Sequence, residues 1–221
     1  RNIEVPQGFQ AKDEENPPAY QGDINRYYLR FAQVYENRIS FGVTLEKDPG
    51  EAFFRNSNKQ GFDFMSAHFM YKKVNKTIDR LVLGDFRAQF GQGLILNTGF
   101  SPGKSAFVTT TRRSGAPLNR FTSVNEQNYL RGAGATLRLN KKMTWTNFVS
   151  FRKRDGNVIQ SDTSDIDLAI QNLNSLQLSG LHRTQREIEG ENTLQQLSLG
   201  TSLKYKVAKG NIAANVLYTQ F

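Results

Sequence analysis

The segment SGLHRTQREIEGEN, residues 179–192, contains the side chains best suited to acid–base chemistry. A histidine side chain ordinarily titrates near neutral pH, and an acid close in sequence to His182, such as Glu187, could orient its ring as in a hydrolase. The external-loop candidates are His182, Arg183, Thr184 and Glu187. The alternative, which we favour, is a hydrogen-bonded cluster that only stabilises the loop. We therefore predict no catalytic residue and a protein that is not an enzyme.

The stretch LVLGDFRAQFGQGLILNTGF, residues 81–100, places two opposite charges inside an apolar run. With charges on neighbouring strands they give five lumen-facing candidates: Arg30, Glu46, Asp85, Arg87 and Arg131. One interpretation is a charged lumen that selects or holds a solute. The other, which we favour, is a set of buried ion pairs, because an unpaired buried charge is strongly destabilising. In both interpretations, the residues at alternate positions of this stretch, Val82, Phe86, Ala88 and Phe90, are expected to face lipid.

Composition excludes several kinds of site. The 221 residues include no cysteine, which excludes disulfides, thiolate-bound metals and cysteine nucleophiles. The two histidines, His68 and His182, have no second ligand type at metal spacing, so we predict neither a metal nor a cofactor. The segments FGQGL and SPGK lack the full phosphate-loop pattern and a following helix, which argues against nucleotide binding.

Apolar and polar residues alternate with a period of two along most of the chain. In ISFGVTLEK, residues 39–47, Ile39, Phe41 and Val43 share one face, and small or polar residues lie on the other. This alternation predicts strands with one apolar and one polar face. Eight strands are expected, at residues 27–36, 39–47, 62–73, 78–91, 129–139, 143–154, 195–207 and 211–221.

Short and long connections alternate between these strands. Tight turns are expected near residues 37–38, 74–77, 140–142 and 208–210, and long loops at 48–61, 92–128 and 155–193. In an up-and-down sheet this places all tight turns at one edge, like the periplasmic turns of outer-membrane barrels. We predict an all-β, antiparallel up-and-down transmembrane β-barrel in the outer membrane. A soluble barrel or sandwich is the alternative.

The two faces of the expected strands favour the membrane interpretation. The polar face carries small residues, Gly42, Gly132, Gly134 and Gly200, together with Thr, Ser, Arg and Lys, as in a crowded, hydrated lumen. The apolar face carries aromatic residues near strand ends, Tyr27, Tyr35, Tyr129 and Tyr205, where the interfacial girdles of a barrel would lie.

The loops and the opening segment complete the predicted domain organisation. Residues 1–26 are interpreted as a polar external loop or linker, and residues 27–221 as the barrel portion. In the loop 155–193, Ser164–Asp167 and Thr184–Glu187 fit a helix-capping pattern, so one or two short helices are expected. The loop 92–128 has no helical period and is expected to be ordered. With the tight turns on the periplasmic side both chain ends lie outside, so we expect an internal portion of a larger barrel.

Basic residues gather at the tight-turn edge of a chain whose net charge is +9. They are Arg38, Lys72, Lys73, Lys76, Lys141, Lys142, Lys204, Lys206 and Lys209. The bilayer and its anionic lipid headgroups are the expected partners. Nucleic acid is disfavoured, because no aromatic–basic stacking platform stands apart from the strands.

Four stretches resemble, in this order, a group of large outer-membrane proteins of Bacteroidota: GFDFMSAHFMYKK, LVLGDFRAQFGQGLIL, FTSVNEQNYLRGAGATL and SGLHRTQREIEGEN. That family is named for a helix-hairpin-helix segment that precedes its barrel and that this chain lacks. The resemblance covers most of residues 27–221. It implies a barrel in the outer membrane but no activity, because the family has none assigned.

The sequence therefore predicts a non-enzymatic outer-membrane protein. It would act as a pore or transporter, or as a membrane component of an envelope complex, with other outer-membrane or secretion-complex subunits as partners. The less favoured alternatives are a hydrolase at the barrel rim, centred on His182, and a soluble ligand-binding barrel.

Overall fold

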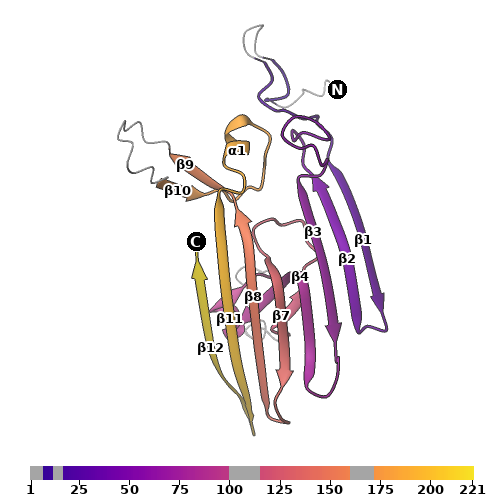
Figure 1. The fold of residues 1–221 in the computed structure, drawn as a ribbon, viewed down its shortest axis with the longest axis vertical. Helices are drawn as coiled ribbons and strands as arrows, with labels where there is room; N and C mark the ends of the chain where they lie inside the picture. Colours follow the sequence, from indigo (N-terminus) through magenta and orange to yellow (C-terminus); the bar gives the residue numbers. More distant parts are fainter. Residues whose placement is uncertain (1–6, 12–16, 100–114, 160–171) are drawn as a thin grey trace, which may run out of the picture. The chain divides into compact units, whose positions relative to one another are not determined.

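The computed structural model describes residues 7–11, 17–99, 115–159 and 172–221 (Figure 1). The strands are β1 (Tyr27–Tyr35), β2 (Ile39–Lys47), β3 (Phe64–Lys72), β4 (Ile78–Phe90), β5 (Leu96–Asn97), β6 (Leu118–Arg120), β7 (Leu130–Arg138), β8 (Met143–Arg154), β9 (Gly156–Ile159), β10 (Asn172–Leu176), β11 (Leu194–Val207) and β12 (Gly210–Gln220). The helical elements are the short η1 (Gly91–Gly93) and α1 (Gln185–Glu189). The fold is all-β, as predicted.

Ten of these strands form one antiparallel, up-and-down sheet. Its order is β1-β2-β3-β4-β7-β8-β11-β12, with β5 and β6 both paired to β4, while β9 and β10 form a separate two-stranded sheet. The eight long strands are the eight predicted ones, each end lying within two residues of its expected position. Because β1 and β12 are the two edges of this order, the sheet formed by the described strands is not closed.

The chain divides into two compact units. The first, which we call the loop unit, consists of Arg1–Leu29, Leu45–Met65 and Lys153–Gln195. The second, the sheet unit, consists of Arg30–Thr44, Ser66–Arg152 and Gln196–Phe221. Within the described residues of both units, no helix is long and apolar enough to span a membrane.

In the sheet unit, many small polar side chains are buried and many large apolar ones are exposed. The buried set includes Ser40, Thr44, Ser66, Thr136, Thr146, Ser150 and Ser198. The exposed set includes Phe41, Val43, Leu83, Trp145, Val149, Phe151, Leu199, Leu203, Ile212 and Val216. The pairing of β7 with β8 maintains this alternation, since Gly132 lies opposite Ser150 and Ala133 lies opposite Val149.

Glycines on the buried face make room for larger side chains. A Cβ at Gly200 would lie 2.1 Å from Phe148 Cε1, and one at Gly134 would lie 2.9 Å from Leu118 Cδ1. Phe148 and Leu118 can therefore lie close against the backbone of the sheet. The apolar core built around them consists of Met70, Val82, Phe86, Ala88, Phe90, Leu118, Leu130 and Phe148.

Strand β4 changes its partners near Gly84. Strand β3 pairs with β4 up to Gly84, and β6 and β5 pair with the residues from Phe86 to Phe90. Gly84 has a φ of +78°, and a Cβ there would lie 2.4 Å from the carbonyl oxygen of Ala67, so this position requires glycine. In Figure 1 the second half of β4 passes behind β7 and β8. The rings of Phe86 and Phe90 lie 5.9 and 5.5 Å from the ring of Phe148 on β8.

The prediction that Val82, Phe86, Ala88 and Phe90 face lipid is wrong. Each is at most 1% exposed, and all four belong to the core of the sheet unit. Alternation places these residues on one face of the strand, but it does not say which face is covered. The cover comes from the core side chains that share this cluster, including Leu118 of β6 and Phe148 of β8.

The connections follow the predicted alternation of short and long. Between β1 and β2, Glu36 and Asn37 have φ values of +48° and +52°, the left-handed conformation typical of tight hairpin turns. In the long connection 92–128, β6 joins the sheet by pairing with β4, and its Leu118 is fully buried. In the connection 155–193, α1 follows Thr184 as predicted, whereas the second capping pattern, Ser164–Asp167, lies outside the described residues.

Candidate functional site

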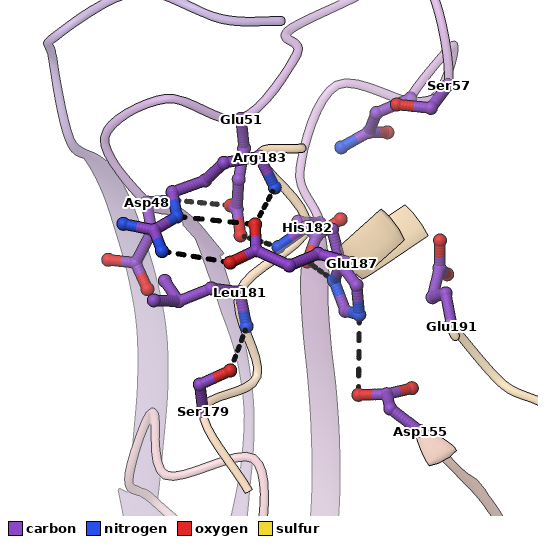
Figure 2. Close-up of polar contacts among 12 residues, drawn as sticks. Asp48, Glu51, Ser57, Asp155, Ser179, Leu181, His182, Arg183, Glu187 and Glu191 are labelled. Carbon is purple, nitrogen blue, oxygen red and sulfur yellow. Dashed lines mark hydrogen bonds and ion pairs between the residues drawn. The ribbon is translucent and has the colours of Figure 1, made fainter. Parts of the chain in front are cut away.

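His182 lies at the centre of a buried polar cluster in the loop unit (Figure 2). Its Nδ1 is 2.5 Å from Asp63 Oδ2, and its Nε2 is 3.3 Å from Asp155 Oδ2. Its backbone N–H donates a hydrogen bond of 3.0 Å to Glu51 Oε1. The side chains of His182 and Asp63 are 7% and 10% exposed, so their charges meet where water screens them little.

Separate segments of the chain bring these residues together. Asp63 immediately precedes β3, Asp155 immediately follows β8, and Glu51 lies in the connection between β2 and β3. His182 lies between β10 and α1. The cluster therefore forms only when these connections pack on one another.

The start of α1 holds the backbone that follows His182. The Thr184 side chain accepts a hydrogen bond from the Glu187 backbone N–H, and the Glu187 carboxylate accepts one from the Thr184 N–H, which is a complete capping box. Arg183 pairs with Glu187 at 2.9 Å and lies over the ring of Tyr20 at 4.7 Å. The predicted candidates Arg183, Thr184 and Glu187 therefore support the segment that carries His182.

Glu51 is a buried carboxylate close to Asp63. Burial and the charge of Asp63 raise the pKa of Glu51 to about 7. The backbone N–H groups of Asp48 and His182 donate to its two oxygens over 2.7 and 3.0 Å, and these bonds favour the ionised form. Glu51 therefore changes its charge near neutral pH.

The protonation of His182 follows from its two aspartate neighbours. Burial by itself lowers the pKa of His182, but the close contacts and negative charges of Asp155 and Asp63 outweigh burial and raise this pKa to about 11. The imidazole is therefore a cation at neutral pH, and an imidazolium cannot accept a proton as a general base. This protonation state suits an ion-pair cluster better than a His/acid catalytic set.

Sequence reasoning identified His182 but missed its partners. Glu51 and Asp63 are 131 and 119 residues away from it along the chain, so no local spacing links them. In the structure, Glu51, Asp63 and His182 place potential metal-ligand atoms within 4.8 Å of one another. They are therefore the described residues that could hold a metal ion.

In the sheet unit, Asp85 and Arg131 form a two-bond ion pair. Arg131 Nε and Nη2 donate to the two Asp85 oxygens over 2.7 and 2.9 Å, and the residues lie opposite each other on β4 and β7. Asp85 Oδ2 also accepts a hydrogen bond of 3.2 Å from the Ala67 backbone N–H on β3. The Asp85 carboxylate therefore takes the place of a backbone acceptor where β4 leaves β3.

The other predicted strand charges make separate contacts. The Arg87 guanidinium lies 5.3 Å from the centre of the Phe121 ring. Arg30 donates to the backbone carbonyl of residue 122, and Glu46 accepts from Arg26. The structure thus brings Asp85 and Arg131 together and places Arg30, Glu46 and Arg87 in contacts of their own. That these side chains face a lumen stays a prediction.

The second histidine has a different environment. His68, in the sheet unit, is buried with its Nε2 3.4 Å from Ser40 Oγ, which also accepts a hydrogen bond of 2.6 Å from Arg120. His68 therefore lies beside a hydroxyl that a guanidinium also contacts, whereas His182 lies directly against a carboxylate.

No family model, no curated protein and no solved structure matches this chain.

Proposed function

We propose that this chain is part of an outer-membrane β-barrel and acts, without catalysing a reaction, as a membrane component of an envelope complex. The observation that carries this proposal is the arrangement of the two faces of the sheet unit. Small polar side chains such as Ser40, Thr136 and Ser150 are buried beside the apolar core, and many large apolar side chains on the strands, such as Phe41, Val149 and Phe151, are exposed. The sequence resemblance to barrels of Bacteroidota supports the same class of protein and the same location.

The exposed apolar side chains repeat at every second position along the strands. Phe41 and Val43 on β2 are each 42% exposed, and Val149 and Phe151 on β8 are 45% and 54% exposed. An extended apolar surface is unfavourable in water by roughly 25 cal/mol per Å². Contact with lipid chains removes this penalty, so the exposed apolar face is favourable in a bilayer.

The edge strands β1 and β12 need hydrogen-bond partners in this setting. Backbone N–H and C=O groups at an open edge would lack partners in the hydrocarbon region, at a cost of several kcal/mol per group. We therefore propose that further strands close the barrel between β12 and β1. In this arrangement, turn lysines such as Lys141 and Lys142 meet anionic headgroups.

A pore or transporter is the second candidate, supported by the buried charges Glu46 and Asp85. Against it, Phe86, Phe90 and Phe148 pack together on the buried face, and a lumen filled by side chains does not conduct. Single-channel recordings distinguish the two candidates. Discrete unitary currents from the chain in a planar bilayer would favour the pore, and a silent bilayer the structural component.

Cysteine labelling tests the membrane proposal directly, because the chain has no cysteine of its own. Val149→Cys places a fluorophore on the exposed apolar face, and Lys141→Cys places one in a tight turn. In phospholipid vesicles, brominated acyl chains should quench the first label strongly and the second weakly. Equal quenching at both positions, or none at either, would contradict a membrane barrel.

A further inference from the structure

We propose that Glu51, Asp63 and His182 form a binding site for one divalent transition-metal ion, with Zn²⁺ the best-suited ion. The proposed site lies entirely within the loop unit. It is therefore independent of whether the sheet unit enters a bilayer, and the two proposals can fail separately.

The potential ligand atoms already converge. One atom from each of Glu51, Asp63 and His182 lies within 4.8 Å of the others. Atoms bound to one zinc ion at about 2.1 Å are roughly 3 to 3.4 Å apart. Asp63 Oδ2 and His182 Nδ1 are 2.5 Å apart, so an ion could replace the proton between them after a movement of about 1 Å or less.

The orientation of the His182 ring is an independent indication of a ligand. The side chain is 7% exposed, and its buried Nε2 makes no hydrogen bond of good geometry within the described structure. Nε2 instead lies 3.3 Å from Asp155 Oδ2 as an ion pair. A carboxylate beside the far ring nitrogen is the arrangement that orients metal-binding histidines and raises their basicity. The geometry therefore makes Nδ1 the ligand atom and Asp155 a positioning residue.

Glu51 is held in place without an ion. Its Oε2 accepts a hydrogen bond of 2.7 Å from the Asp48 backbone N–H, and its Oε1 accepts one of 3.0 Å from the His182 backbone N–H. Each carboxylate oxygen keeps a second lone pair that can bind a cation. Little side-chain entropy is then lost when Glu51 becomes a ligand.

The charges of the cluster also favour a dication. Glu51, Asp63 and Asp155 all lie near the single imidazolium of His182. Arg183 interacts electrostatically with Glu51, but its guanidinium is engaged with a carboxylate of α1. A divalent ion between Glu51 and Asp63 would relieve the repulsion between these two carboxylates.

The donor set selects among metals. One imidazole nitrogen with two carboxylate oxygens suits Zn²⁺ and, less well, Mn²⁺, and leaves a fourth position for water. Ca²⁺ prefers six to eight oxygen ligands. Binding exchanges the Nδ1 proton for the ion and releases that proton to solvent, so the affinity should rise with pH.

Calorimetric titration with ZnCl₂ tests the site on the whole chain, purified without a histidine tag and treated with a chelator. One ion should bind per chain. His182→Gln and Asp63→Asn should each weaken binding by about 100-fold or more, and Asp155→Asn by about 10- to 100-fold. The matched controls His68→Gln and Asp79→Asn lie in the sheet unit and should leave the affinity unchanged.

Cobalt spectroscopy keeps the test valid if a variant folds poorly. Co²⁺ bound to the native chain should give visible d–d absorption that His68→Gln retains and His182→Gln loses. Added Zn²⁺ should raise the unfolding temperature of the native chain and of His68→Gln. Equal zinc affinity in His182→Gln and the native chain, or no binding by the native chain in large zinc excess, would overturn the proposal.

Discussion

Asp85 in the sheet unit and Asp63 in the loop unit are both nearly buried carboxylates that meet a cation, but their surroundings differ. Asp85 bonds to Arg131, whose side chain is 46% exposed. Asp63 bonds to His182, whose side chain is 7% exposed and also faces Asp155. The first site is an ion pair whose cation is partly exposed to solvent. The second is a buried cation shared between carboxylates.

The difference follows from how each site is built. Asp85 and Arg131 lie directly opposite each other on β4 and β7, so strand register alone brings them together. The His182 cluster instead requires several connections to pack in place. A buried cation among carboxylates has no access to water when a partner is removed, whereas Arg131 has. Substitutions should therefore lower the free energy of unfolding more in the His182 cluster than in the Asp85–Arg131 pair.

The largest effect is expected for His182→Ala. This change leaves the Asp63 and Asp155 carboxylates buried without the imidazolium between them, at a cost of about 3–5 kcal/mol in the free energy of unfolding. Urea denaturation of the metal-free chain measures it. A loss of less than about 1 kcal/mol would mean that these carboxylates reach water or other cations easily, and the contrast with Asp85 would disappear.

The pH dependence of stability should separate the cluster from the pair. Because the pKa of His182 is raised from 6.5 to about 11 in the folded chain, its contribution is fully present below pH 6.5 and is lost as pH rises through about 11. The difference in unfolding free energy between the native chain and His182→Ala should therefore shrink from pH 7 to 11. A difference that stays constant over this window would contradict the cluster as described.

A smaller effect is expected for Asp85→Ala. The change removes the acceptor of the Ala67 backbone N–H, while Arg131 can turn to solvent, so we expect a loss of about 1–3 kcal/mol. The matched control is Asp79→Ala, on the same strand, because the Asp79–Arg138 pair is 36% and 43% exposed and should contribute about 0–1 kcal/mol. Equal losses in the two variants would show that burial of Asp85 does not matter.

The smallest effect is expected for Thr184→Ala, which removes the cap of α1 beside His182. Loss of the capping hydrogen bond should lower the unfolding free energy by about 1 kcal/mol, and Thr184→Ser should retain it. Amide hydrogen exchange at Glu187, whose N–H bonds the Thr184 hydroxyl, reports on the same bond. Unchanged exchange in Thr184→Ala would show that the cap does not hold this segment.

Local sequence patterns correctly predicted a strand, β2, and the helix start at Thr184 in the loop unit. Alternation in ISFGVTLEK matches β2 at both ends, and the spacing of Thr184 and Glu187 matches the observed capping box. The face of β4 was predicted wrongly, because period two groups Val82 with Phe86 without saying what covers them. Only the packing of the core, which includes Leu118 and Phe148, decides that.

The sequence by itself determined the eight long strands, the tight turns and the helix start at Thr184, because backbone alternation and capping depend on neighbouring residues. Tertiary structure alone decided that Asp63 and Glu51 meet His182, since these contacts span 119 and 131 residues. It also decided which face of each strand is buried. Long-range contacts depend on how loops and strands pack, and this packing produces no periodic pattern in the sequence.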